Sequence, residues 1–173
     1  MYGIILQSIV DAHLGDARWT QVKDRADVDD ENFDAFETVR DEELVGRLTR
    51  CAVELSRPGD DVTVDYLMRM CGERFVAYVC CRHADYGRIL PVLGRRMRDF
   101  LNGLDKLHEY VRPRFPLMSP PSFFCDAETS DGMTLHYRSR RRGFEYYVAG
   151  QIREVRGRVG GATLPARLET SDR

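Results

Sequence analysis

Apolar residues recur every three or four positions over the first two thirds of the chain. This spacing puts them on one face of an α-helix, so the N-terminal part is predicted to be mainly helical. The expected helices carry, in order, Ile4, Ile5 and Ile9; Trp19, Val22 and Ala26; residues 44–55; Leu67, Met68 and Cys71 after a cap at Asp61 or Thr63; and residues 89–111 with a break near Gly94.

The pattern changes after residue 112. Residues 122–125 and 133–139 are predicted to be strands, and Asp131-Gly132 is a turn signal between them, so an antiparallel hairpin is expected. A last helix is predicted over residues 143–156, and residues 162–169 are a candidate for one more strand. The prolines that exclude a continuing helix before the hairpin are Pro113, Pro116, Pro120 and Pro121.

The last predicted helix has one apolar face. Helical spacing turns Tyr147 toward the core and leaves its neighbour Tyr146 on the outward flank. The order of elements predicts an α+β fold, with a mainly helical N-terminal part followed by a small antiparallel sheet with a packed helix, in a single domain over residues 1–173. The predicted inward face consists of Phe144, Tyr147, Val148, Ile152 and Val155.

The composition is typical of a globular protein of one domain. The 173 residues are 43% hydrophobic and 31% charged, and 26 Lys and Arg face 28 Asp and Glu. A chain so close to neutrality has no overall field that attracts nucleic acid or membrane, and no apolar run approaches the length that spans a bilayer. The first residues lack the features of a signal peptide. Five cysteines without C-x-x-C spacing indicate reduced thiols in a cytoplasmic protein.

The predicted helix over residues 89–111 carries the first candidate for chemistry. Its apolar stripe of Met97, Leu101 and Leu104 continues at helical spacing to His108. A buried imidazole needs a partner, and a metal ion suits a neutral ring nitrogen in apolar surroundings. The alternative is a core histidine that bonds to a nearby carbonyl or hydroxyl group. The spacing alone leaves both interpretations open.

The segment Leu135-His-Tyr-Arg-Ser-Arg-Arg141 carries the second candidate. If it is extended, Tyr137, Ser139 and Arg141 share one face of the strand. Two hydroxyl groups and a permanent positive charge suit carboxylates or phosphates. One alternative is a solvated basic rim, and another is a module that binds polyanions. The basic run is short and no nucleic-acid-binding motif accompanies it.

Five segments of the chain match one known family. They are, in family order, Met1-Tyr-Gly3, Leu90-Pro-Val-Leu-Gly94, Asp99-Phe-Leu-Asn-Gly-Leu-Asp-Lys-Leu-His108, Pro121-Ser-Phe-Phe-Cys125 and Leu135-His-Tyr-x-Ser-x-Arg141. The chain thereby resembles the heme nitric oxide/oxygen binding (H-NOX) domain, and most of all the N-terminal sensor domain of the soluble guanylate cyclase beta subunit. The likeness extends from residue 1 to about residue 157.

The resemblance implies a cofactor, heme b (iron protoporphyrin IX). His108 would be the proximal iron ligand, as the apolar helix already allows. Tyr137, Ser139 and Arg141 would hold the two propionates, which suit charge-assisted donors. The other contacts would be Pro121 against the porphyrin, Leu101 and Leu104 on the stripe of His108, and Ile5, Phe75 and Tyr147 on the distal side.

The resemblance also implies a sensor rather than an enzyme. Its ligands would be NO and CO, with O2 added where Tyr147 donates a hydrogen bond to it, and gas binding would change the bond between iron and His108. The partner would be a guanylate cyclase module or another signalling protein, not nucleic acid or membrane. Family sheets usually have further strands, so the sheet is expected to be truncated at its C-terminal end. A heme-free interaction or dimerisation domain of the same fold is the alternative.

Overall fold

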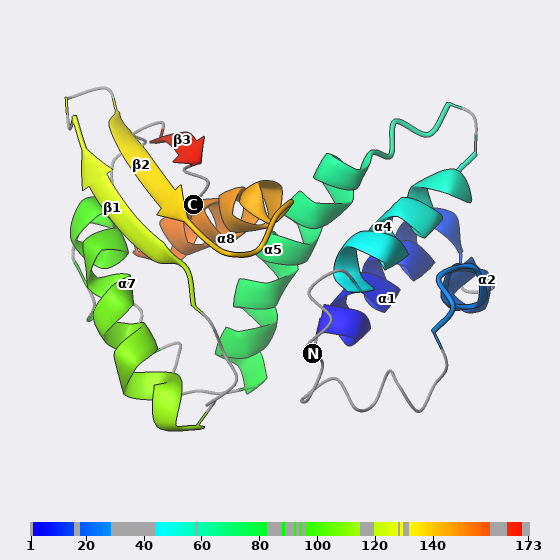
Figure 1. The fold of residues 1–173 in the computed structure, drawn as a ribbon, viewed down its shortest axis with the longest axis horizontal. Helices are drawn as coiled ribbons and strands as arrows, with labels where there is room; N and C mark the ends of the chain where they lie inside the picture. Colours follow the sequence, from blue (N-terminus) through cyan, green and yellow to red (C-terminus); the bar gives the residue numbers. More distant parts are fainter. Residues whose placement is uncertain are drawn as a thin grey trace. The chain divides into compact units, whose positions relative to one another are not determined.

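The computed structural model describes residues 2–15, 18–28, 44–57, 59–82, 88, 92, 94, 96–114, 120–127, 129, 132–159 and 166–170. These residues form an α+β fold, as predicted (Figure 1). The elements are α1 (Tyr2–Leu14), α2 (Arg18–Arg25), α4 (Leu44–Glu54), α5 (Val64–Arg82), α7 (Met97–Val111), η3 (Arg112–Arg114), β1 (Ser122–Asp126), β2 (Met133–Arg138), α8 (Glu145–Val159) and β3 (Ala166–Thr170).

The chain divides into two compact units. We call Met1–Phe75 with Tyr146–Gln151 the helical unit, and Val76–Glu145 with Ile152–Arg173 the sheet unit. Each unit has its own set of packed elements. None of the helices in the described residues combines the length and hydropathy needed to cross a bilayer.

The helical unit is built around α1, α2 and α4, which pack on one another. Apolar side chains at helical spacing fill the space between them because that burial removes them from water. The start of α5 is capped as predicted, since Thr63 Oγ1 accepts the backbone N–H of Tyr66 at 3.1 Å. The fully buried core positions of this unit include Leu6, Ile9, Val22, Leu48 and Leu67.

Two glycines allow close backbone contact in the helical unit. A Cβ atom at Gly72 of α5 would overlap the carbonyl oxygen of Tyr147 in α8, and a Cβ atom at Gly150 of α8 would overlap the carbonyl oxygen of Arg69. Glycine in a helix interior costs stability relative to alanine, so a helix retains it where another backbone approaches. The two glycines therefore fix how this part of α8 lies against α5.

The sheet unit has three strands in the order β1-β2-β3. The predicted hairpin is confirmed, because β1 pairs antiparallel with β2 in a register that joins Phe123 to Tyr137. β3 overlaps the candidate strand at residues 162–169 and ends one residue after it, and it pairs parallel with β2. In this parallel register Ala166, the first residue of β3, pairs with Met133, the first residue of β2, and α8 separates the two strands along the chain.

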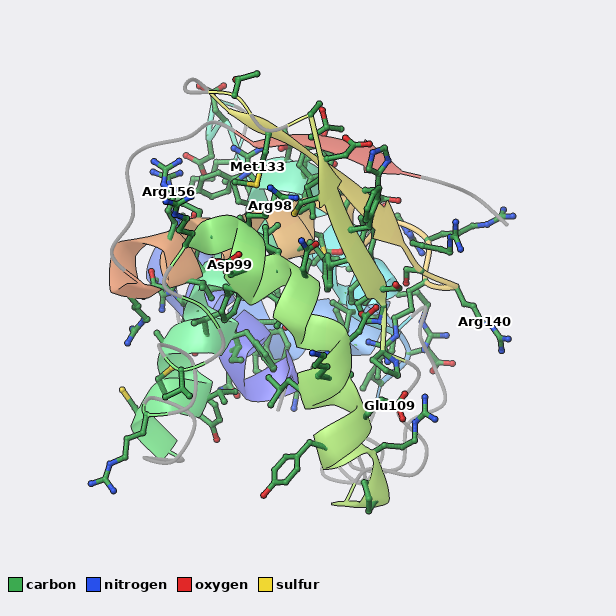
Figure 2. All side chains as sticks on the ribbon, turned by 90° about the vertical axis from the view of Figure 1, so that its left-hand side faces the viewer. Arg98, Asp99, Glu109, Met133, Arg140 and Arg156 are labelled. Carbon is green, nitrogen blue, oxygen red and sulfur yellow. The ribbon has the colours of Figure 1, made fainter. Side chains whose placement is uncertain are left out.

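Helix α7 packs against β1 in the same unit. The buried face of the hairpin alternates with the pleat, and it includes Phe123, Cys125 and Leu135. Leu101 of α7 is fully buried. Figure 2 shows α7 alongside the strands, with Arg98 near one end of the helix and Glu109 near the other.

The structure confirms one expectation and corrects another. Gly94 is not helical and Arg96 is extended (φ −115°, ψ 151°), so the predicted break near Gly94 is confirmed and α7 begins at Met97; residues 89–91 of the predicted helix lie outside the described residues. β2 ends at Arg138, so the residues after it do not continue the strand.

Candidate functional site

His108 lies in the last turn of α7 and its side chain is half-buried. Burial lowers the pKa of the imidazole, while the charge of Asp105, the backbone of Pro121 and the charge of Glu109 act in the opposite direction. The net effect is a lower pKa than usual, which favours the neutral ring. Within the described residues, the buried Nδ1 atom has no hydrogen-bond partner. A neutral imidazole with a buried nitrogen to spare is suited to a ligand that the protein itself does not supply.

One aromatic ring adjoins His108 in the sheet unit, and a second ring adjoins the first. The ring of Phe123 on β1 lies 6.4 Å from the imidazole, at an interplanar angle of 38°. The ring of Tyr137 on β2 lies 5.7 Å from that of Phe123, at 34°. Both side chains are buried, at 8% and 4% exposure. Phe123 had not been predicted as a site residue, although its place in the alternating strand and the pairing of β1 with β2 could have indicated it.

Ser139 and Arg141 lie in a turn after β2, not on an extended face with Tyr137. The backbone N–H of Arg141 donates to Ser139 Oγ at 3.0 Å, which closes the turn. The guanidinium carbon of Arg141 lies 5.7 Å from the ring centre of Phe144. Gly143 completes the turn with a φ of 77°, a conformation that glycine adopts without strain. The predicted shared face was wrong because the prediction continued the strand to Arg141, whereas β2 ends at Arg138.

The turn after β2 also carries exposed cations. Arg140 projects away from the sheet unit in Figure 2, and Arg142 is exposed as well. Arg141 is half-buried and held against Phe144. Of the arginines in this run, Arg141 is therefore the one whose position the protein fixes.

The remaining predicted contacts divide between the two units. In the sheet unit, Leu101 is buried, whereas Leu104 and Pro121 are half-buried. In the helical unit, Ile5 and Tyr147 are buried. The ring of Phe75 lies 5.8 Å from that of Tyr147, at an interplanar angle of 59°. Three of the predicted contacts, Ile5, Phe75 and Tyr147, thus belong to the helical unit, and the others belong to the sheet unit.

The residues of the sheet unit fit a heme. Heme iron takes one neutral imidazole from the protein, and His108 offers one with a buried nitrogen. Heme also carries two carboxylates, which hydroxyl and guanidinium donors such as those of Tyr137 and Arg141 can bind. The described residues contain no group of three His, Cys, Asp or Glu side chains that could hold a metal ion with protein ligands alone.

Known proteins resemble the chain over most of its length. The sequence model of the Haem-NO-binding family matches residues 2–159. Soluble guanylate cyclase gcy-31 of Caenorhabditis elegans is 40% identical over 158 residues, which are 90% of this chain and 22% of that protein. Soluble guanylate cyclase gcy-33 of the same organism is 31% identical over 159 residues, 90% of this chain and 16% of that protein. The chain therefore spans about a fifth of the length of these relatives.

A solved structure shares the fold. A mutant of the H-NOX protein from K. algicida, in its Fe(II) unliganded form, superposes with a TM-score of 0.70 at 18% identity, over 90% of this chain and 81% of that one. The predicted resemblance is thus confirmed by sequence and by fold, and the heme-free alternative gains no support from either comparison. This chain belongs to the Haem-NO-binding (H-NOX) family.

Proposed function

We propose that this H-NOX domain senses diatomic gases through a heme b held by His108, as a single domain over residues 1–173. The observation that carries the proposal is the buried Nδ1 atom of His108, which the described residues leave without a hydrogen-bond partner. Burial costs free energy for an imidazole nitrogen that lacks a partner, so a site that keeps one is suited to a bound group. Membership of a family described as Haem-NO-binding identifies the class of that group.

The candidate site residues of the sheet unit would hold the heme in different ways. Bound ferrous heme would supply an iron with one open position for a gas. His108 stays neutral at pH 7, because burial lowers its pKa, and so keeps a nitrogen lone pair for the metal. Tyr137, Ser139 and Arg141 would hold the heme carboxylates by hydrogen bonds and charge, while Pro121 would lie against the porphyrin and Leu101 and Leu104 would exclude water beside His108.

The helical unit would set which gas is retained. We assign Ile5 and Phe75 to apolar contact with the gas side, and Tyr147 to a hydrogen bond. A buried phenol can donate to a gas that carries partial negative charge, as O2 does, whereas NO and CO need no such donor. The proposed ligands are therefore NO, CO and O2.

The output would pass to a signalling partner. The chain spans about a fifth of relatives named soluble guanylate cyclases, so we propose a cyclase module as the partner and assign no catalysis to residues 1–173. His108 is the link, because any change in what its imidazole binds acts directly on α7. We further propose a cytoplasmic location without nucleic acid or membrane as partners, since the chain is near neutral and its cysteines lack disulfide spacing.

Absorption spectra of the purified chain test this proposal. The protein supplied with hemin and reduced under argon is expected to show a Soret band that shifts with CO and with NO. His108→Gly should lose the cofactor, and added imidazole should restore it, whereas His13→Ala should retain it because His13 is exposed on α1. A protein that stays colourless with hemin, or a His108→Gly variant that binds heme as tightly as the parent, would refute the assignment.

A further inference from the structure

β1 forms one end of the sheet order β1-β2-β3, so its outer edge has no strand beside it in the described residues. Two side chains of α7 reach this strand. The backbone N–H of Cys125 donates to Asn102 Oδ1 at 3.1 Å, and the hydroxyl of Ser122 donates to Asp105 Oδ2 at 2.9 Å. The helix thus supplies acceptors where a neighbouring strand would otherwise stand.

The contacts follow a regular order along α7. Asn102, Asp105 and His108 are spaced three residues apart, so they lie within less than two turns of one another. The partners of Asn102 and Asp105, namely Cys125 and Ser122, follow in the reverse direction along the chain. α7 therefore runs antiparallel to β1, and His108 lies three residues beyond the second contact.

The contact of Asn102 differs from that of Asp105. The donor to Asn102 is the backbone N–H of Cys125, a residue of β1 whose side chain is buried. A backbone group in a paired strand cannot rotate away, so this bond fixes one point of α7 on β1. The Ser122–Asp105 bond joins two exposed side chains, which can exchange it for water at little cost.

We infer that Asn102 is a positioning residue for His108, and that it anchors α7 at the edge of β1. The inference rests on the proposed function. His108 lies six residue steps after Asn102 along the helix, a rise of about 9 Å. A tilt of α7 by about 10° at the anchor would therefore move His108 by about 1.5 Å, enough to change the strain on a bond from the imidazole.

The anchor also limits how α7 can move. Apolar contacts between α7 and β1 hold the helix on the sheet but have no direction, so they allow it to slide. The bond from Cys125 to Asn102 is directional and sets the register of the helix on the strand. Loss of the bond should leave α7 folded and in contact with β1, with a wider range of positions for His108.

The test compares three variants of the chain with the parent. Asn102→Leu removes the acceptor, Asn102→Asp keeps an acceptor oxygen, and Lys106→Leu changes an exposed residue of the same helix. The first readout is hydrogen exchange of the Cys125 amide in the heme-free protein. Asn102→Leu should speed this exchange about fivefold, which corresponds to one hydrogen bond of about 1 kcal/mol, while the other two variants should match the parent.

The second readout is the iron–histidine stretching frequency of the reduced, heme-loaded protein, from resonance Raman spectra. Asn102→Leu should shift or broaden this band, and Asn102→Asp should restore it. Faster exchange at Cys125 with an unchanged band would overturn the positioning role, and unchanged exchange would overturn the anchor itself. Those outcomes leave the proposed function intact. If the parent protein showed no Soret band, both the proposed function and the positioning role of Asn102 would be refuted.

Discussion

At the scale of single residues, the environment of a thiol decides its reactivity. Burial raises the pKa of Cys71 to about 12, against a smaller opposing effect of Arg74. Cys81 is exposed at the C-terminal end of α5. At pH 8, iodoacetamide should therefore modify Cys81 in the native protein and leave Cys71 unmodified, because the thiolate is the reactive form. Peptide mass spectrometry would measure the labelling of each cysteine. Equal labelling of Cys71 and Cys81 in the native protein would contradict the prediction. In urea, where the protein is unfolded, both cysteines should react.

Tyr147 carries the residue-scale prediction on gas selectivity. If its hydroxyl donates to bound O2, Tyr147→Phe should weaken O2 binding by about 1 kcal/mol, or about fivefold, and leave CO binding nearly unchanged. Tyr146→Phe is the matched control, because Tyr146 is 40% exposed whereas Tyr147 is buried. Equilibrium titrations of the reduced protein would measure both gases. An equal loss of O2 and CO affinity would indicate a packing effect instead.

At the scale of elements, the close contact of α5 with α8 should be sensitive to a single methyl group. Gly72→Ala places a Cβ atom against the carbonyl of Tyr147, so a backbone must shift, at a cost of about 1–3 kcal/mol. Gly157→Ala on α8 meets nothing within 4 Å and should stabilise the helix by about 0.5–1 kcal/mol. Urea unfolding of both variants would measure their free energies of unfolding, which should fall for Gly72→Ala and rise for Gly157→Ala. A neutral Gly72→Ala variant would show that the helices are not in backbone contact.

The hairpin and the helices could be predicted from the sequence because their signals are local. Alternation in β1 and β2, and helical spacing around Leu101, each specify a face without knowledge of any partner. The parallel pairing of β3 could not be predicted, because it depends on where α8 returns the chain. The turn at Ser139 was missed for a similar reason, since its hydroxyl replaces strand pairing with a local bond to the N–H of Arg141.

The candidate site was predicted in part by spacing and in part by resemblance. The stripe leading to His108 indicated a buried imidazole, and the structure has a half-buried side chain there with a buried Nδ1 atom. Its assignment to heme came from the family motifs. Phe123 and Asn102 were missed, because a contact between a helix and a strand edge depends on tertiary packing and has no spacing of its own.

At the scale of the whole molecule, His108 links stability to pH. The pKa of His108 is lowered in the folded protein, whereas in the unfolded chain it has its ordinary value of 6.5. The unfolded chain therefore takes up a proton more readily. The heme-free protein should thus have its full stability above pH 6.5 and lose part of it as the pH falls through 6.5 toward the lower folded value. Urea unfolding from about pH 8 to about pH 5 would measure this, with His108→Leu as the reference. If the free energy of unfolding had the same pH dependence in the parent and the variant, His108 would not be the cause of the loss at low pH.

The parallel partner of β2 has a consequence for how the molecule assembles. β1 and β2 adjoin along the chain, so their pairing closes a short loop, whereas β3 joins β2 only across all of α8. Contacts between distant segments form more slowly because more chain entropy is lost before they form. We therefore expect β1 to pair with β2 before β3 joins them in newly made chains. In that interval the backbone of β2 would be open to strands of other molecules, and crowding at high expression would favour aggregation.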